Sequence, residues 1–130
     1  MIVYLGTNDL ADRYNLSGAD VADACASLVS VVRYADCGRD GTHPPVLLVC
    51  PPPILATGTE AAEYEGMAVR SRDLGRYFAQ AAEEARAELL DLDGVVRYAE
   101  EDPIHLEADA HRALAEAVEA RVRKLLPSPS

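Results

Sequence analysis

The chain has 130 residues, of which 49% are hydrophobic, and a formal net charge of −10. This length suits a single domain with a buried core. The negative charge argues against a cationic groove for nucleic acid and against an anionic membrane surface as partner. No apolar run approaches the ~18 residues of a membrane-spanning helix. We also expect no signal peptide, because Met1 leads into an apolar run without a charged segment.

Three cysteines, Cys25, Cys37 and Cys50, are an odd and widely spaced set. They form neither a CxxC pair nor a zinc-binding spacing. Free cysteine is among the most buried residue types, so we expect buried free thiols. A reducing compartment and a cytoplasmic location follow as expectations.

Three short apolar runs are predicted to be strands. Residues 1–5 and 46–50 lack polar alternation, which is typical of strands covered on both faces in a parallel sheet. A polar loop from Gly6 ends the first strand, and three prolines from Pro51 end the second. A third, shorter strand is expected within residues 89–92, with an uncertain boundary.

Three helical patterns follow these strands in turn. Ser17 is expected to cap the first helix, with Asp20 at the capping-box position. The second helix is expected over about residues 67–90, after a loop at 54–66, and the third over 107–126. The first helix carries an apolar stripe with three- and four-residue spacing. That stripe consists of Val21, Ala24, Cys25, Leu28, Val31, Val32 and Ala35.

Alternating strands and helices predict a parallel sheet with right-handed helical crossovers. Ligands bind such sheets beyond the carboxyl ends of the strands. Residues 6–9, 51–53 and 102–105 each follow a predicted strand, so we expect them at one edge of the sheet. Residues 1–126 are expected to form a single domain, and residues 127–130 a disordered tail.

Two features at this edge could carry chemistry. On a loop, the three-residue spacing of Asp102 and His105 lets the carboxylate fold back onto the imidazole, which leaves the other ring nitrogen free to take a proton. An exposed loop histidine near scattered acids is the structural alternative. The side-chain amide of Asn8 could donate to a developing oxyanion, or Asn8 could be a turn former or helix cap.

Other titratable and nucleophilic residues give weaker patterns. A metal site built from Asp102, His105, Asp109 and His111 would match no common cluster spacing. His43 is expected to be a solvated loop residue, and His111 to lie on the surface or core edge of the last helix. The serines of residues 1–126 fall in or at the start of helices, rather than on the tight strand-to-helix turn that exposes a nucleophile.

Two short motifs together resemble a known family. Residues 2–9 (IVYLGTND) resemble the third conserved block, GxND, of the SGNH hydrolases, also called GDSL esterases and lipases. Residues 102–105 (DPIH) resemble their fifth block, DxxH. The apolar strand closed by Pro51 and Pro52, and the helix starting near residue 65, are similar to the bacterial arylesterase and acyltransferase branch. The resemblance runs from Met1 to about residue 125.

The resemblance implies a flavodoxin-like three-layer α/β/α fold and hydrolysis of carboxylic esters through an acyl-serine, without a metal or organic cofactor. By analogy, His105 would be the general base, Asp102 would orient it, and Asn8 would donate to the oxyanion. Gly6, Thr7, Pro51 and Pro52 would line the pocket for a small ester substrate.

This sequence departs from the family pattern in three ways. The first block, which bears the nucleophilic serine, and the second block, which supplies an oxyanion-hole glycine, have no counterpart here. Pro103 stands where the family commonly has glycine, which fixes φ and removes an N–H. We therefore expect the C-terminal part of such an enzyme, an N-terminally truncated domain with about three strands and three helices. It would be inactive in isolation, because losing a triad member costs several orders of magnitude in rate.

A second hypothesis makes the chain a non-catalytic interaction module or pseudoenzyme. Without neighbouring strands, residues 1–5 would form an exposed sheet edge that could pair with a second copy or with a partner chain. A third possibility, a small response-regulator-type domain, is disfavoured because the acidic cluster expected after its first strand is missing.

Overall fold

The structure is a computed structural model that describes residues 1–126. Three strands form one parallel sheet in the order β1-β2-β3. They are β1 (Ile2–Tyr4), β2 (Leu47–Cys50) and β3 (Glu88–Asp91). The predicted parallel sheet is confirmed, while the predicted tail at 127–130 lies outside the described residues.

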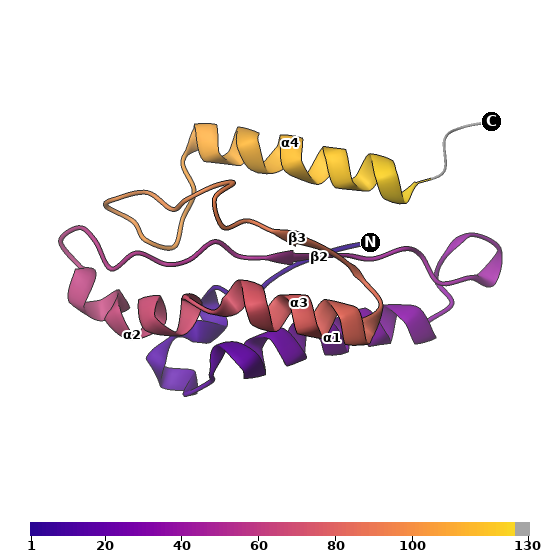
Figure 1. Cartoon of the computed structure of the whole chain (residues 1–130), viewed down its shortest axis with the longest axis horizontal. Helices are drawn as coiled ribbons and strands as arrows, with labels where there is room; N and C mark the ends of the chain where they lie inside the picture. The colour runs from indigo at the N-terminus through magenta and orange to yellow at the C-terminus, as the bar shows by residue number, and fades with distance from the viewer. Residues whose placement is uncertain (127–130) are drawn as a thin grey trace.

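Four α-helices complete the three layers (Figure 1). They are α1 (Gly18–Tyr34), α2 (Ala61–Ser71), α3 (Leu74–Ala85) and α4 (Ala108–Leu125). Figure 1 shows α1 and α3 on one face of the sheet and α4 on the other. This arrangement confirms the predicted three-layer α/β/α fold class. No helix among residues 1–126 combines the length and apolar character needed to cross a membrane.

The uninterrupted apolar run of β2 is explained by its place in the middle of the sheet, where all four of its residues are buried. β1 is different, because it lies at the edge. Only Val3 is buried in β1, while Ile2 keeps 48% of its surface exposed. The apolar sequence of β1 is therefore covered only in part.

The start of α1 is set by the predicted capping box. The Ser17 hydroxyl accepts from the Asp20 backbone N–H at 3.2 Å, and the Asp20 carboxylate accepts from the Ser17 N–H at 2.8 Å. The Ser17 hydroxyl also donates to the Asp20 carboxylate at 2.6 Å, and this bond, together with the one from the Ser17 N–H, lowers the pKa of Asp20 below its ordinary value. The prediction for this helix start is confirmed.

The predicted helix over 67–90 is wrong in its boundaries. It is divided between α2 and α3, and its last residues belong to β3. The loop predicted over 54–66 is also wrong, because α2 begins at Ala61 and contains Gly66. Gly66 leaves room beside α2 for the exposed Asp12 side chain, whose carboxylate a Cβ on Gly66 would meet. That contact depends on a residue far away in the sequence.

The sheet separates two apolar cores. One lies between the sheet and α1 and α3, and the other between the sheet and α4. The apolar side of α4 packs into the second core. Only three of the seven residues of the predicted α1 stripe are buried, namely Val21, Cys25 and Val32, while the other four are exposed. Those four are Ala24, Leu28, Val31 and Ala35.

The cysteines follow the prediction in two positions of three. Cys25 and Cys50 are buried free thiols, whereas Cys37 is exposed. Burial raises the pKa of Cys25 to about 11 and raises that of Cys50 further. Both buried thiols therefore stay protonated near neutral pH.

Candidate functional site

The loop after β1 carries Asn8 beyond the carboxyl end of the sheet. It turns at Gly6, whose φ of +118° lies in a region that side chains rarely adopt. A Cβ on Gly6 would also come within 2.9 Å of Val21 Cγ1. The chain then enters the 3₁₀ helix η1 (Asn8–Leu10), in which Leu10 is buried and Asn8 is exposed.

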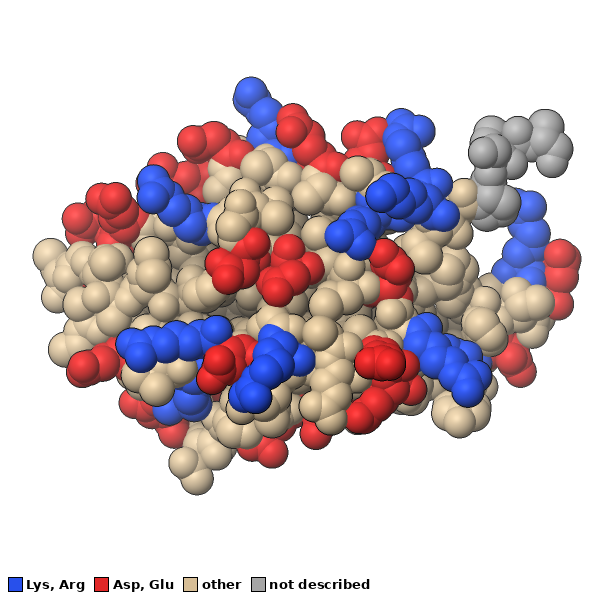
Figure 2. All heavy atoms as spheres, in the orientation of Figure 1, with Lys and Arg blue, Asp and Glu red and all other residues tan. Residues whose placement is uncertain are grey.

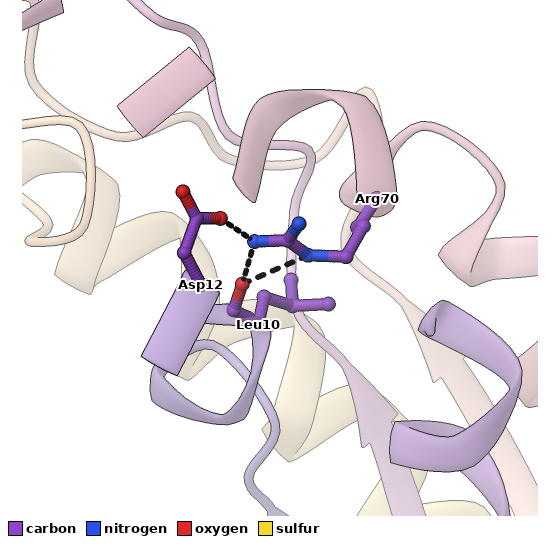
Figure 3. Close-up of polar contacts among 3 residues, drawn as sticks. All are labelled: Leu10, Asp12 and Arg70. Carbon is purple, nitrogen blue, oxygen red and sulfur yellow. Dashed lines mark hydrogen bonds and ion pairs between the residues drawn. The ribbon is translucent and has the colours of Figure 1, made fainter. Parts of the chain in front are cut away.

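Arg70 of α2 holds this loop in place through its guanidinium hydrogen bonds (Figure 3). Its Nε donates to the Leu10 carbonyl at 3.0 Å, and its Nη2 donates to the same carbonyl and to the Asp12 carboxylate. A guanidinium offers several N–H donors in a fixed plane, so it can hold both acceptors at once. We did not predict this contact from the sequence, because its partners are about 60 residues apart.

Tyr98 ties the first loop to the third. Its hydroxyl lies 2.7 Å from Thr7 Oγ1, and either group can donate. Tyr98 is buried, and burial raises its pKa above the ordinary value, so the phenol stays protonated. Thr7 was predicted to line a substrate pocket, and its hydroxyl is already held by this hydrogen bond.

The proline segment after β2 lies beneath the same edge. Pro51 and Pro52 are fully buried, and a Cβ on Gly6 would lie 3.8 Å from Pro51 Cγ. Further along, the Thr57 hydroxyl donates to the Glu100 carbonyl at 3.0 Å. The three loops therefore converge at one edge, as predicted. The proposed contact of Gly6, Pro51 and Pro52 with a substrate stays a prediction.

Asp102 and His105 form the pair that their spacing suggested. His105 Nδ1 lies 2.9 Å from Oδ1 and 2.8 Å from Oδ2 of Asp102. The hydrogen bond to His105 lowers the pKa of Asp102 below its usual range. Both side chains are open to solvent, with 72% of His105 and 50% of Asp102 exposed.

The turn between these residues accommodates Pro103. The backbone N–H groups of Ile104 and His105 donate to Asp102 Oδ1 and to the Asp102 carbonyl, both at 3.4 Å. The His105 carbonyl accepts from the Ala99 N–H at 3.1 Å. None of these bonds needs an N–H from Pro103, which is itself buried. The departure at this position therefore leaves the Asp–His geometry intact.

A cavity of about 320 Å³ brings the first and third loops together with α2. Asn8 lies on its wall, as does Ile104, the residue between Pro103 and His105. Tyr64 and Met67 of α2 add an apolar side. Asn8 and the loop of the Asp–His pair thus share one hollow, which is large enough for a small acyl or aryl group.

The serine hydroxyls of residues 1–126 are bonded elsewhere. Ser27 and Ser30 donate to carbonyls four residues back in α1, and Ser17 belongs to the capping box. Ser71 is buried, donates to Ala68 at 2.9 Å and accepts from the Ile54 N–H at 2.8 Å. Within residues 1–126, no group of three or more His, Cys, Asp or Glu side chains is arranged to hold a metal ion.

The arrangement can accept and pass on a proton. With Nδ1 on the Asp102 carboxylate, Nε2 is the nitrogen left to serve as a base. Asn8 supplies an exposed amide at the same edge. What a hydrolase would need in addition is a hydroxyl nucleophile within reach of Nε2.

Solved structures of bacterial esterases are similar to this chain. The native aryl esterase of M. smegmatis is 28% identical, with a TM-score of 0.84. A carbohydrate acetylesterase from Sinorhizobium meliloti is 27% identical with a TM-score of 0.83, and a carbohydrate acetylesterase family member from the same organism is 28% identical with 0.87. Each match covers 96% of this chain and 60% of the other.

No protein-family profile and no curated protein sequence matches the chain. The chain spans about 60% of the length of the solved structures that it matches. Over nearly its whole length, it therefore shares the SGNH hydrolase fold of these esterases.

Proposed function

We propose that this chain is the general-base part of an SGNH, or GDSL-type, hydrolase of carboxylic esters. The observation that carries the proposal is the placement of His105 Nδ1 on both carboxylate oxygens of Asp102, at 2.8 and 2.9 Å. It gains support from solved neighbours that are named as an aryl esterase and as carbohydrate acetylesterases.

In this proposal each residue has one task. His105 Nε2 takes the proton of a serine hydroxyl as the serine oxygen attacks the ester carbonyl, and Asp102 holds the ring and stabilises its charged form. Asn8 donates to the oxygen that becomes negative. His105 then returns the proton to the departing alcohol, leaving an acyl-serine. Water, activated by the same base, releases the acid and restores the serine.

The proposal assigns the serine to a polypeptide segment outside these residues. The serine hydroxyls of residues 1–126 are held in helices or in the capping box. The thiols of Cys25 and Cys50 are buried and protonated. We therefore propose that the isolated chain has no serine-dependent esterase activity.

Hydrolysis of p-nitrophenyl acetate by the purified chain tests this proposal. We expect the same rate for the chain, for His105→Ala and for the matched control His111→Ala, an exposed histidine on α4. Equal rates above buffer would indicate nonspecific reaction of surface groups. A rate that falls in His105→Ala alone would reveal a nucleophile within the chain and overturn its proposed inactivity.

A second candidate function is interaction without catalysis, favoured by the edge position of β1 and the exposure of Ile2. The two functions differ in whether the Asp–His pair is needed for hydrolysis once a partner is bound.

A cytoplasmic location remains part of the proposal and fits the free thiols of Cys25, Cys37 and Cys50.

A further inference from the structure

The two edges of the sheet differ, because a charged side chain of α4 covers part of the β3 edge. The N–H groups of Glu88 and Leu92 donate to carbonyls of β2 and of the residue just before it. The Leu89 carbonyl, which alternates with these groups along the strand, therefore faces away from β2. Arg121 of α4 donates to that carbonyl at 3.1 Å and to the Glu88 carboxylate at 2.7 Å. A charged side chain over an edge carbonyl discourages pairing with another strand.

The edge at β1 has no such cap among residues 1–126. The Met1 carbonyl accepts from the Leu47 N–H at 2.9 Å, so residues 1 and 3 direct their backbone groups at β2. By the alternation of a parallel ladder, the N–H and C=O groups of Ile2 and Tyr4 face the open side. Four backbone hydrogen-bonding groups are therefore available to a further strand.

An uncharged helix flank lies beside this open edge. From Ala24 to Val32, α1 contains no charged residue, although Ala24, Leu28 and Val31 are exposed. Surface helices normally present charged or polar residues to solvent. A run of exposed apolar positions at four- and three-residue spacing is instead typical of a helix face that packs against something.

The geometry of α1 indicates on which side this flank lies. α1 packs on β1 and β2, while α3 packs on β2 and β3. Arg33 reaches α3, donating to the Ala85 carbonyl at 3.1 Å. Val31 precedes Arg33 by two residues, about 200° around an α-helix. Val31 therefore lies on the flank away from α3, which is the side of the open β1 edge.

On the face of the sheet that α4 covers, the β1 edge also borders exposed apolar surface. An apolar groove of about 320 Å³ runs along the β1 edge where α4 leaves it uncovered. Its lining consists of Met1, Ile2, Pro45, Leu47, Val122, Leu125 and Leu126. The open strand thus has uncovered apolar surface both toward α1 and toward α4.

The opposite side of the molecule has an ordinary surface. In Figure 1, α3 passes in front of α1, so the face drawn in Figure 2 is the side of α3 and β3. Figure 2 shows basic and acidic side chains interspersed across that face. The face drawn in Figure 2 therefore differs from residues 24–32 of α1, which carry no charged side chain.

We propose that the β1 edge and the exposed flank of α1 dock a strand-and-helix segment of polypeptide. Its strand would pair with Ile2 and Tyr4, and its helix would cover Leu28 and Val31. The segment corresponds to the part of each solved esterase that the match does not cover, which is about two fifths of that protein. The match covers 96% of this chain. A second copy is a poorer occupant, because it would carry the same net charge of −10.

This inference rests on the proposed function in taking the segment from an SGNH-type esterase. The experiment co-expresses the chain with the tagged, unmatched part of the M. smegmatis aryl esterase. Size-exclusion chromatography with light scattering then reports the complex. We expect a one-to-one complex whose affinity falls at least about tenfold in Val31→Asp, since a buried carboxylate without a partner is strongly disfavoured.

The matched control is Val69→Asp, on α2. Val69 is 53% exposed and Val31 63% exposed, so neither change should unfold the free chain, which circular dichroism verifies. The Val69 variant should bind as the parent does. A free monomer that forms no complex would overturn the docking surface. A dimer of the chain alone that Val31→Asp dissociates would overturn the chosen occupant.

The esterase activity of the complex distinguishes a failure of the docking surface from a failure of the proposed function. A complex that hydrolyses p-nitrophenyl acetate, and loses that activity in His105→Ala without losing affinity, supports both. A complex without His105-dependent hydrolysis keeps the docking surface and contradicts the proposed function. Equal binding by the Val31 and Val69 variants contradicts the docking surface whatever the activity.

Discussion

The imidazole of His105 faces the carboxylate of Asp102, with Nδ1 within 2.9 Å of both oxygens. The three-residue turn between them is closed by backbone N–H groups of Ile104 and His105. The pair is therefore preorganised by local structure, within the chain as it stands. A base held in this way needs only a suitably placed hydroxyl to act on.

The first prediction concerns the acidity of Asp102. Its pKa is held below the ordinary 3.8 by the hydrogen bond to His105, so His105→Ala should raise it toward that value. The pair stabilises the fold above that ordinary pKa, and this contribution is lost as the pH falls through the lowered value. Carboxyl NMR titration measures the shift, with His111→Ala as the control. An unchanged Asp102 titration in His105→Ala would contradict the pairing.

The second prediction concerns the turn at Gly6. Gly6→Ala should lower the free energy of unfolding by more than about 3 kcal/mol, because the strained φ and the contact with Val21 act together. Gly94 also has a positive φ, but a Cβ there would meet nothing within 4 Å. Gly94→Ala should therefore cost only about 1–2 kcal/mol. Urea unfolding compares the two, and equal losses would rule out the steric contribution at Gly6.

The third prediction concerns the anchoring of the Asn8 loop by Arg70. Arg70→Ala removes the donors to the buried residue Leu10 and should cost about 1–3 kcal/mol. Asp12→Ala removes only an exposed ion-pair partner and should cost at most about 1 kcal/mol. Hydrogen exchange should quicken across residues 8–15 in the Arg70 variant alone. Equal exchange in both variants would contradict an anchoring role for the Leu10 contact.

The fourth prediction concerns stability at alkaline pH. Burial raises the pKa of Tyr98 above the ordinary 10.0, so its contribution is fully present below pH 10.0 and is lost as the pH rises through the folded value. Tyr98→Phe should cost about 1 kcal/mol at neutral pH through the lost bond to Thr7. Between neutral pH and about pH 11, the free energy of unfolding should then fall less for the Tyr98→Phe variant than for the parent protein. Tyr34→Phe, at an exposed tyrosine, is the matched control, and a similar slope for all three proteins would contradict the assignment.

Much of the fold follows from local sequence. Apolar runs ended by Gly6 and Pro51 mark two strand ends, and Ser17 with Asp20 marks a helix start. These signals are local because caps and breakers act through neighbouring backbone groups. The Asp102–His105 pair was predictable for the same reason, since both partners lie on one turn.

What the sequence did not reveal depends on contacts between distant segments. No proline marks the break between α2 and α3, and only the structure shows that Gly66 lies against Asp12. Arg70 and Tyr98 hold the Asn8 loop from about 60 and 90 residues away. The four exposed residues of the α1 stripe have the sequence pattern of a core face, because periodicity shows that a face is apolar and does not show what covers it.

We propose that this chain holds a general base and its orienting carboxylate, with no serine nucleophile among residues 1–126. A fluorophosphonate, which reacts with activated serines, tests it most directly when labelling is followed by intact-mass measurement of the chain and of His105→Ala. We expect that neither protein gains the phosphonyl group. A serine that is labelled in the parent and unlabelled in His105→Ala would contradict it.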